Sequence, residues 1–171
     1  DIHHVMDEAV CGHRYAKSAV GIALYDLLGK STGLPVFKIL GGRGGCIPVV
    51  WLVSALQGPQ AIDEASRRIK EGFKTVKVKV GTNWQQEVAF LRELRSEVGE
   101  QPEIRLDANG AWHWKQALRY IRQMESLNIS LLEQPVPAWD MDGLRKVCNR
   151  SPIPIVADEC APTLHDVHAL S

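Results

Sequence analysis

The sequence predicts an α/β protein in which parallel strands alternate with covering helices, and three observations lead to this prediction. Between residues 47 and 171, five apolar or β-branched stretches are each followed by a helix-like stretch. The strand-like stretches lie roughly 25 to 30 residues apart, as strand-helix repeats in a parallel sheet do. The last four carry a charged side chain near their ends, at Lys79, Asp107, Glu133 and Asp158. This pattern favours a barrel, where ligands bind at the carboxyl ends of several strands.

An open, doubly wound sheet fits the same alternation of strands and helices. Such sheets usually bind their ligand at one switch point, through a glycine-rich phosphate turn. No G-x-G-x-x-G or P-loop pattern follows any predicted strand in this sequence. We therefore expect the barrel.

The predicted elements can be assigned in chain order. Apolar residues at helical spacing predict a helix over 12–29 that stops at Gly29, and Pro35 with several glycines marks a connection after it. We expect residues 1–46 to be a helical lead-in segment and residues 47–171 to be the first five βα units of the barrel. The strands are expected at 47–54, 74–81, 103–112, 129–137 and 153–160, and their helices at 59–72, 83–99, 114–127, 140–151 and 163–171.

Composition excludes several classes of function. The 171 residues include 20 basic and 20 acidic side chains, so nothing indicates a nucleic-acid partner. No apolar run is long enough to span a membrane, and the first ten residues lack the order of a secretion signal. Four scattered cysteines without a C-x-x-C pair indicate neither a disulfide framework nor a zinc site. We expect a soluble, cytoplasmic protein with no membrane contact.

The stretch VKVKVGT places Lys77 and Lys79 on one face of a strand and valines on the other. By itself this pattern also suits an antiparallel edge strand with its lysines in solvent. In a parallel sheet between helices, however, both faces are normally buried, so the lysines would point into the barrel. Burial and a neighbouring cation both lower the pKa of a lysine. A neutral lysine of this pair could then act as a general base.

Three acids follow the lysines, one in each successive βα unit. Asp107, Glu133 and Asp158 are 26 and 25 positions apart. Any one of them could instead be a helix N-cap or a turn residue. Three carboxylates at one place repel each other unless a cation binds them, and an all-oxygen site suits Mg²⁺ or Mn²⁺. A lysine base beside such an ion can remove a proton next to a carboxylate, because the ion stabilises the resulting enediolate.

The sequence resembles the enolase superfamily, and within it the muconate lactonizing enzyme subgroup of the mandelate racemase and muconate lactonizing enzyme proteins. The resemblance rests on KVKVG, RLDANGAW, LLEQPVP and VADEC in that order, and GLPVFKILGG resembles the segment leading into the family's barrel. It implies a (β/α)7β TIM-like barrel, a small carboxylate substrate and a homo-oligomer. A histidine in place of Lys79 would have indicated the mandelate racemase subgroup.

The resemblance also implies a role for each matching residue. Lys79 corresponds to the base that abstracts the proton, and Lys77 to its neighbour that helps to hold the substrate carboxylate and to lower the pKa of the base. Asn109 corresponds to a polar contact at the site, and Glu159 to a support next to the last metal ligand. The Mg²⁺ ligands correspond to Asp107, Glu133 and Asp158.

This chain matches only part of the family's length. The family's barrel continues to a sixth strand, where another lysine faces the substrate from the opposite side, and a capping domain closes the site. We expect both to be absent here, so that the chain is part of a larger polypeptide. The predicted reaction is cycloisomerisation. Its alternatives are racemisation or epimerisation of an amino-acid derivative, dehydration of a sugar acid, or a fragment without catalytic activity.

Overall fold

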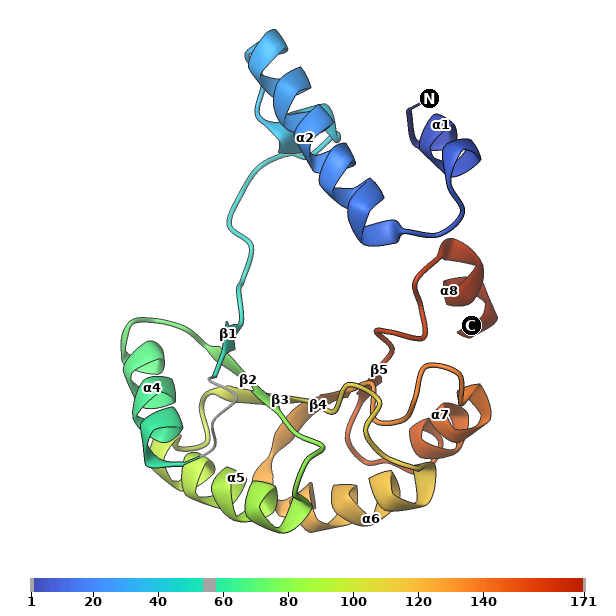
Figure 1. The fold of residues 1–171 in the computed structure, drawn as a ribbon. Helices are drawn as coiled ribbons and strands as arrows, with labels where there is room; N and C mark the ends of the chain where they lie inside the picture. The colour runs from blue at the N-terminus through green and yellow to red at the C-terminus, as the bar shows by residue number, and fades with distance from the viewer. Residues whose placement is uncertain (1, 54–57, 171) are drawn as a thin grey trace. The chain divides into compact units, whose positions relative to one another are not determined.

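The computed structural model describes residues 2–53 and 58–170 (Figure 1). The chain forms two compact units, which we describe separately: Asp1–Pro48 and Val49–Ser171. Among the described residues, no helix is both long enough and apolar enough to cross a membrane.

The first unit consists of the helices α1 (Ile2–Ala9), α2 (Arg14–Thr32) and α3 (Val36–Ile39). The predicted helix is present, but it continues past Gly29 and is capped by Gly33, whose φ of 68° suits a glycine. Gly29 has a different function inside the helix. A Cβ atom at this position would lie 2.8 Å from the carbonyl oxygen of Leu34, so the glycine allows the following chain to pack closely.

The second unit alternates strands and helices as the sequence predicts. The strands form one parallel sheet in the order β1-β2-β3-β4-β5. An open doubly wound sheet would reverse its strand order, whereas consecutive neighbours are the order found in a barrel. In chain order the elements are β1 (Trp51–Leu52), α4 (Pro59–Lys70), β2 (Thr75–Lys79), α5 (Trp84–Val98), β3 (Glu103–Asp107), α6 (Trp114–Met124), the 3-10 helix η1 (Glu125–Leu127), β4 (Ile129–Glu133), α7 (Met141–Cys148), β5 (Ile155–Val156) and α8 (Leu164–Leu170).

The outer strands are shorter than the sequence predicts. β1 has two residues where a strand over 47–54 was expected, and the end of that stretch, Ser54, lies outside the described residues. β5 also has two residues and pairs with β4 through Ile155 and Val156. The three central strands have five residues each and pair with one another along their length.

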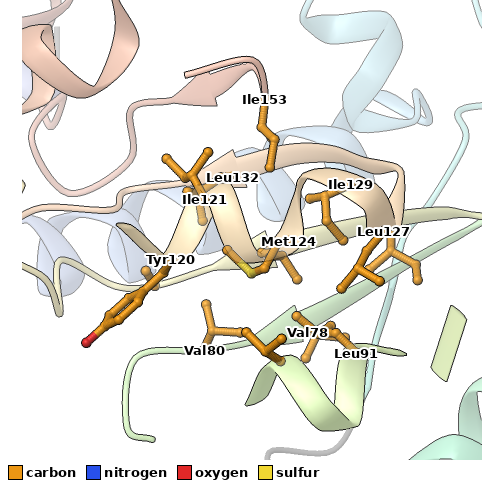
Figure 2. Packing of buried hydrophobic residues seen from close by; sticks show 14 of the residues in the cluster. Val78, Val80, Leu91, Tyr120, Ile121, Met124, Leu127, Ile129, Leu132 and Ile153 are labelled. Carbon is orange, nitrogen blue, oxygen red and sulfur yellow. The ribbon is translucent and has the colours of Figure 1, made fainter. Parts of the chain in front are cut away.

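Helices α4 to α7 lie along one face of the sheet (Figure 1). The apolar side chains of the strands point to this face, which is why every second residue of β2 is buried. Figure 2 shows Val78 and Val80 packed with Leu91 of α5 and Met124 of α6. Burial of this cluster stabilises the sheet-helix layer and leaves the other face of the strands for polar side chains.

Candidate active site

The register of the sheet brings the predicted residues into one row. Lys79 pairs with Asp107, Asp107 with Glu133, and Glu133 with Val156 on the four adjacent strands. Residues that are partners in a parallel sheet point to the same face. Lys77 lies two residues before Lys79 and shares that face, which is the one opposite the helices. Both lysines therefore face away from the apolar layer.

Two lysines and two carboxylates contact each other in this row. The Lys77 ammonium nitrogen lies 2.7 Å from an oxygen of Glu133 and 2.9 Å from Oδ2 of Asp107. The Lys79 nitrogen lies 2.6 Å from the same Asp107 oxygen. The side chain of Asp107 is 1% exposed, while those of Lys77 and Lys79 are 20% and 36% exposed. Lys79 is thus the more accessible of the two lysines.

These contacts shift the pKa of Asp107 and the pKa of Lys77 from their ordinary values. Burial raises the pKa of the Asp107 carboxyl, but hydrogen bonds from Lys79, Lys77 and the backbone N–H of Asn109 outweigh burial and hold the pKa below its ordinary value. Burial likewise lowers the pKa of Lys77, and hydrogen bonds to Glu133 and Asp107 outweigh it, so that the pKa is raised. Burial alone would lower the pKa of Lys77, and the two carboxylates around it reverse that direction.

Asn109 connects the lysine row to the turn after β5. Its Oδ1 accepts a hydrogen bond of 2.5 Å from Lys79, and its Nδ2 donates one of 2.8 Å to Glu159. Its backbone N–H donates to Oδ1 of Asp107 at 3.0 Å. The backbone φ of 43° lies in the left-handed region, which asparagine tolerates better than most residues. Both residues predicted to support the site thus contact it.

Asp158 lies on the exposed turn after β5, where its backbone N–H donates to the side chain of Gln134. Within residues 2–53 and 58–170, no three His, Cys, Asp or Glu side chains are grouped closely enough to hold a metal ion. The predicted carboxylate triad is therefore not assembled, although two of its members, Asp107 and Glu133, already contact one shared cation, the Lys77 ammonium.

The chemistry of the donor set fits a divalent cation. The candidate residues contribute oxygen ligands only, which suit Mg²⁺ or Mn²⁺. Four carboxylates, Asp107, Glu133, Asp158 and Glu159, stand against two ammonium groups, which leaves a formal excess of two negative charges. A divalent ion would balance this excess.

Two residues that the sequence did not single out hold the loop after Lys79. Oε1 of Glu87, which is buried, accepts hydrogen bonds from the backbone N–H groups of Gly81, Thr82 and Asn83. Gly81 has a φ of 122°, and a Cβ atom there would lie 2.5 Å from the Cβ of Ala111. The loop therefore packs tightly against the DANGA segment. A glycine two residues after the strand-ending Lys79 was the available signal.

Two family models cover most of the chain. Residues 60–171 match the enolase C-terminal domain-like model. The chain belongs to the enolase-like family. Residues 1–41 match the N-terminal domain of mandelate racemase and muconate lactonizing enzyme, so the segment expected to be a lead-in to the barrel carries sequence of that domain.

Curated relatives and solved structures agree with this assignment. The chain is 38% identical over 156 residues to the L-Ala-D/L-Glu epimerase of Clostridium acetobutylicum, covering 90% of this chain and 44% of the epimerase. It is 31% identical to muconate cycloisomerase 1 of Pseudomonas putida, covering 97% and 45%. The dipeptide epimerase of Enterococcus faecalis, solved with Mg and the dipeptide L-Leu-L-Tyr, superposes with a TM-score of 0.91 at 35% identity, covering 99% and 48%. The chain thus spans less than half the length of these relatives.

Proposed function

We propose that this chain forms the metal-binding and proton-abstracting part of an isomerase that epimerises an amino-acid derivative of the dipeptide type. The observation that carries the proposal is the row of Lys77, Lys79, Asp107 and Glu133 at the carboxyl ends of adjacent strands. The named relatives support the substrate class, because one is an L-Ala-D/L-Glu epimerase and another was solved with a dipeptide.

Lys79 is the proposed base. It is the more exposed lysine, and its ammonium group donates hydrogen bonds to Asp107 and Asn109. To act as a base it first releases a proton to solvent and then accepts the proton from the substrate α-carbon, becoming an ammonium again. The positive charge that Lys79 gains with this proton balances the negative charge left on the substrate.

Lys77 has the complementary role of a fixed positive charge. Its ammonium group contacts both Asp107 and Glu133, and these hydrogen bonds raise its pKa, which favours the charged form that would hold the substrate carboxylate. Asp107, Glu133 and Asp158 would hold the divalent ion. The ion, when bound, supplies positive charge to the substrate carboxylate oxygens as the α-proton leaves. Inversion at the α-carbon also needs a proton donor on the opposite face, and the family resemblance implies that this donor comes from a strand after β5.

Exchange of the substrate α-proton with solvent tests this proposal. In deuterated water with Mg²⁺, we expect the ¹H NMR signal of the α-proton on the Glu residue of L-Ala-L-Glu to disappear. Lys79→Ala should slow the exchange at least about 100-fold, because general-base catalysis typically contributes that much. The matched control is Lys74→Ala, an exposed lysine immediately before β2, which should exchange at the wild-type rate. Wild-type exchange in Lys79→Ala would show that Lys79 is not the base.

Cycloisomerisation remains the second candidate, since a muconate cycloisomerase is among the relatives. It would use the same lysine and the same metal ligands, but in ring formation a carboxylate of muconate adds across a C=C bond. Lys79 would then donate a proton to the resulting enediolate carbon instead of removing one. Incubation with cis,cis-muconate and with L-Ala-L-Glu separates the two candidates. Lactone formation without deuterium incorporation into the dipeptide would favour the cycloisomerase.

A further inference from the structure

Gln134 directly follows Glu133 and has two properties that are costly for a glutamine. Its side chain is fully buried, with 0% exposure, and its backbone φ is 38°, in the left-handed region. A buried amide without hydrogen bonds is strongly unfavourable, and a left-handed conformation adds backbone strain. Such a residue persists where its surroundings compensate for both costs.

The surroundings of Gln134 provide that compensation through hydrogen bonds to the segment after β5. Its side-chain Oε1 accepts from the backbone N–H of Asp158 at 2.9 Å and from that of Cys160 at 3.3 Å. Its Nε2 donates to the carbonyl oxygen of Val136 at 2.8 Å. Its backbone N–H donates to the carbonyl oxygen of Val156 at 2.9 Å. One side chain thus joins the loop after β4 to the turn after β5.

This turn has little other support from the sheet. β5 is two residues long, and its register with β4 ends at the pair Glu133 and Val156. The turn nevertheless carries Asp158 and Glu159, and Glu159 contacts the Asn109 side chain at 2.8 Å. The Gln134 side chain accepts hydrogen bonds from residues just beyond the last strand pair. These bonds fix the backbone that carries both acids.

We propose that Gln134 is a positioning residue that holds the 158–160 turn against the end of β4, and thereby places Glu159 beside Asn109 and fixes the backbone position of Asp158. The value of this placement for metal binding rests on the proposed function. The placement itself exists without metal or substrate, so it can be tested independently.

Three variants separate the positioning role from general packing. Gln134→Met keeps the length of the side chain but removes its hydrogen bonds. Gln134→Glu keeps acceptor oxygens for the Asp158 and Cys160 N–H groups and loses the donor to Val136. The control, Gln123→Met, makes the same change at an exposed position of α6.

Amide hydrogen exchange in the metal-free protein is the main measurement, with the Asn109 side-chain NH₂ signal as a second one. In Gln134→Met, we expect the Asp158 and Cys160 amides to exchange at least tenfold faster, while Leu106 in the centre of β3 keeps its protection. The Asn109 signal should shift toward that of a free amide, because Glu159 is released. Gln134→Glu should keep both amides protected, and Gln123→Met should leave all signals unchanged.

Wild-type exchange at Asp158 and Cys160 in a folded Gln134→Met protein would overturn the proposal. If Gln134→Met does not fold, Gln134→Glu decides, and loss of protection at the two amides despite the retained acceptors would overturn it. Titration of the same samples with Mn²⁺ distinguishes the two proposals. A wild-type protein that does not bind Mn²⁺ contradicts the proposed function, whereas the positioning role is decided by the metal-free data.

Discussion

The two ends of the parallel sheet both carry buried or half-buried cations, but they use them differently. At the amino end, Arg95 of α5 donates hydrogen bonds to the carbonyl oxygens of Gly99, Pro102, Leu127 and Asn128, just before β3 and β4. These acceptors are neutral backbone groups, which do not titrate and are already bonded to the guanidinium. At the carboxyl end, Lys77 and Lys79 contact carboxylates, which can do both.

This difference suggests that the amino ends of the strands serve stability and that the carboxyl ends serve chemistry. Fixed backbone acceptors give Arg95 a role in holding strand starts together. Ionisable acceptors let the lysine row exchange protons or accept another cation. In barrels the amino end generally contributes stability and the carboxyl end carries the active site. Replacing a cation by methionine at each end provides a direct comparison.

The larger effect on stability is expected at the amino end. Arg95→Met removes the donor for four carbonyl oxygens, two of them in fully buried hydrogen bonds, and should lower the free energy of unfolding by about 3 kcal/mol. Urea denaturation followed by circular dichroism measures this loss. Arg92→Met, at an exposed position of the same helix, should change it by less than about 0.5 kcal/mol. Equal losses of unfolding free energy in the two variants would show that Arg95 does not hold the strand starts together.

A smaller effect is expected from Lys77→Met at the carboxyl end. Asp107 keeps the hydrogen bonds from Lys79 and Asn109, whereas Glu133 loses its bonds to Lys77, so the free energy of unfolding at pH 7 should fall by about 2 kcal/mol. The pKa of Lys77 is raised in the folded state, so its contribution is complete below the ordinary lysine pKa and is lost as pH rises through the raised value. The gap between wild type and Lys77→Met should therefore narrow above about pH 10.4. A gap that widens there would mean that the folded pKa is lowered.

Sequence patterns predicted the strand order, the covering helices and the row of Lys77, Lys79, Asp107 and Glu133, but not that Asp158 lies apart from this row on an exposed turn. They did so because β-strand alternation and the spacing of βα units are local properties of the chain. The pattern could not show that Gly29 lies inside a helix, because the reason is a close approach to the Leu34 carbonyl. The direction of the Lys77 pKa also depended on which groups surround it. Burial alone predicted a fall, and two carboxylates reversed it.

The role of Gln134 also could not be predicted from local sequence patterns. Its place between Glu133 and Pro135 is visible in the sequence, but its partners Asp158 and Cys160 lie 24 and 26 residues away. Only the parallel register of β4 and β5 brings them together. Glu87 is similar, because its role depends on the loop that folds back over the first turn of α5.

The most direct test of the account is a Mn²⁺ titration followed by electron paramagnetic resonance. We expect wild type to bind one Mn²⁺ that Mg²⁺ displaces, and Asp107→Asn to weaken binding at least tenfold, because it loses a charged oxygen ligand. Asp63→Asn, an exposed acid on α4, is the matched control and should bind as wild type does. Unchanged Mn²⁺ affinity in Asp107→Asn would contradict the claim that the strand-end carboxylates form the metal site.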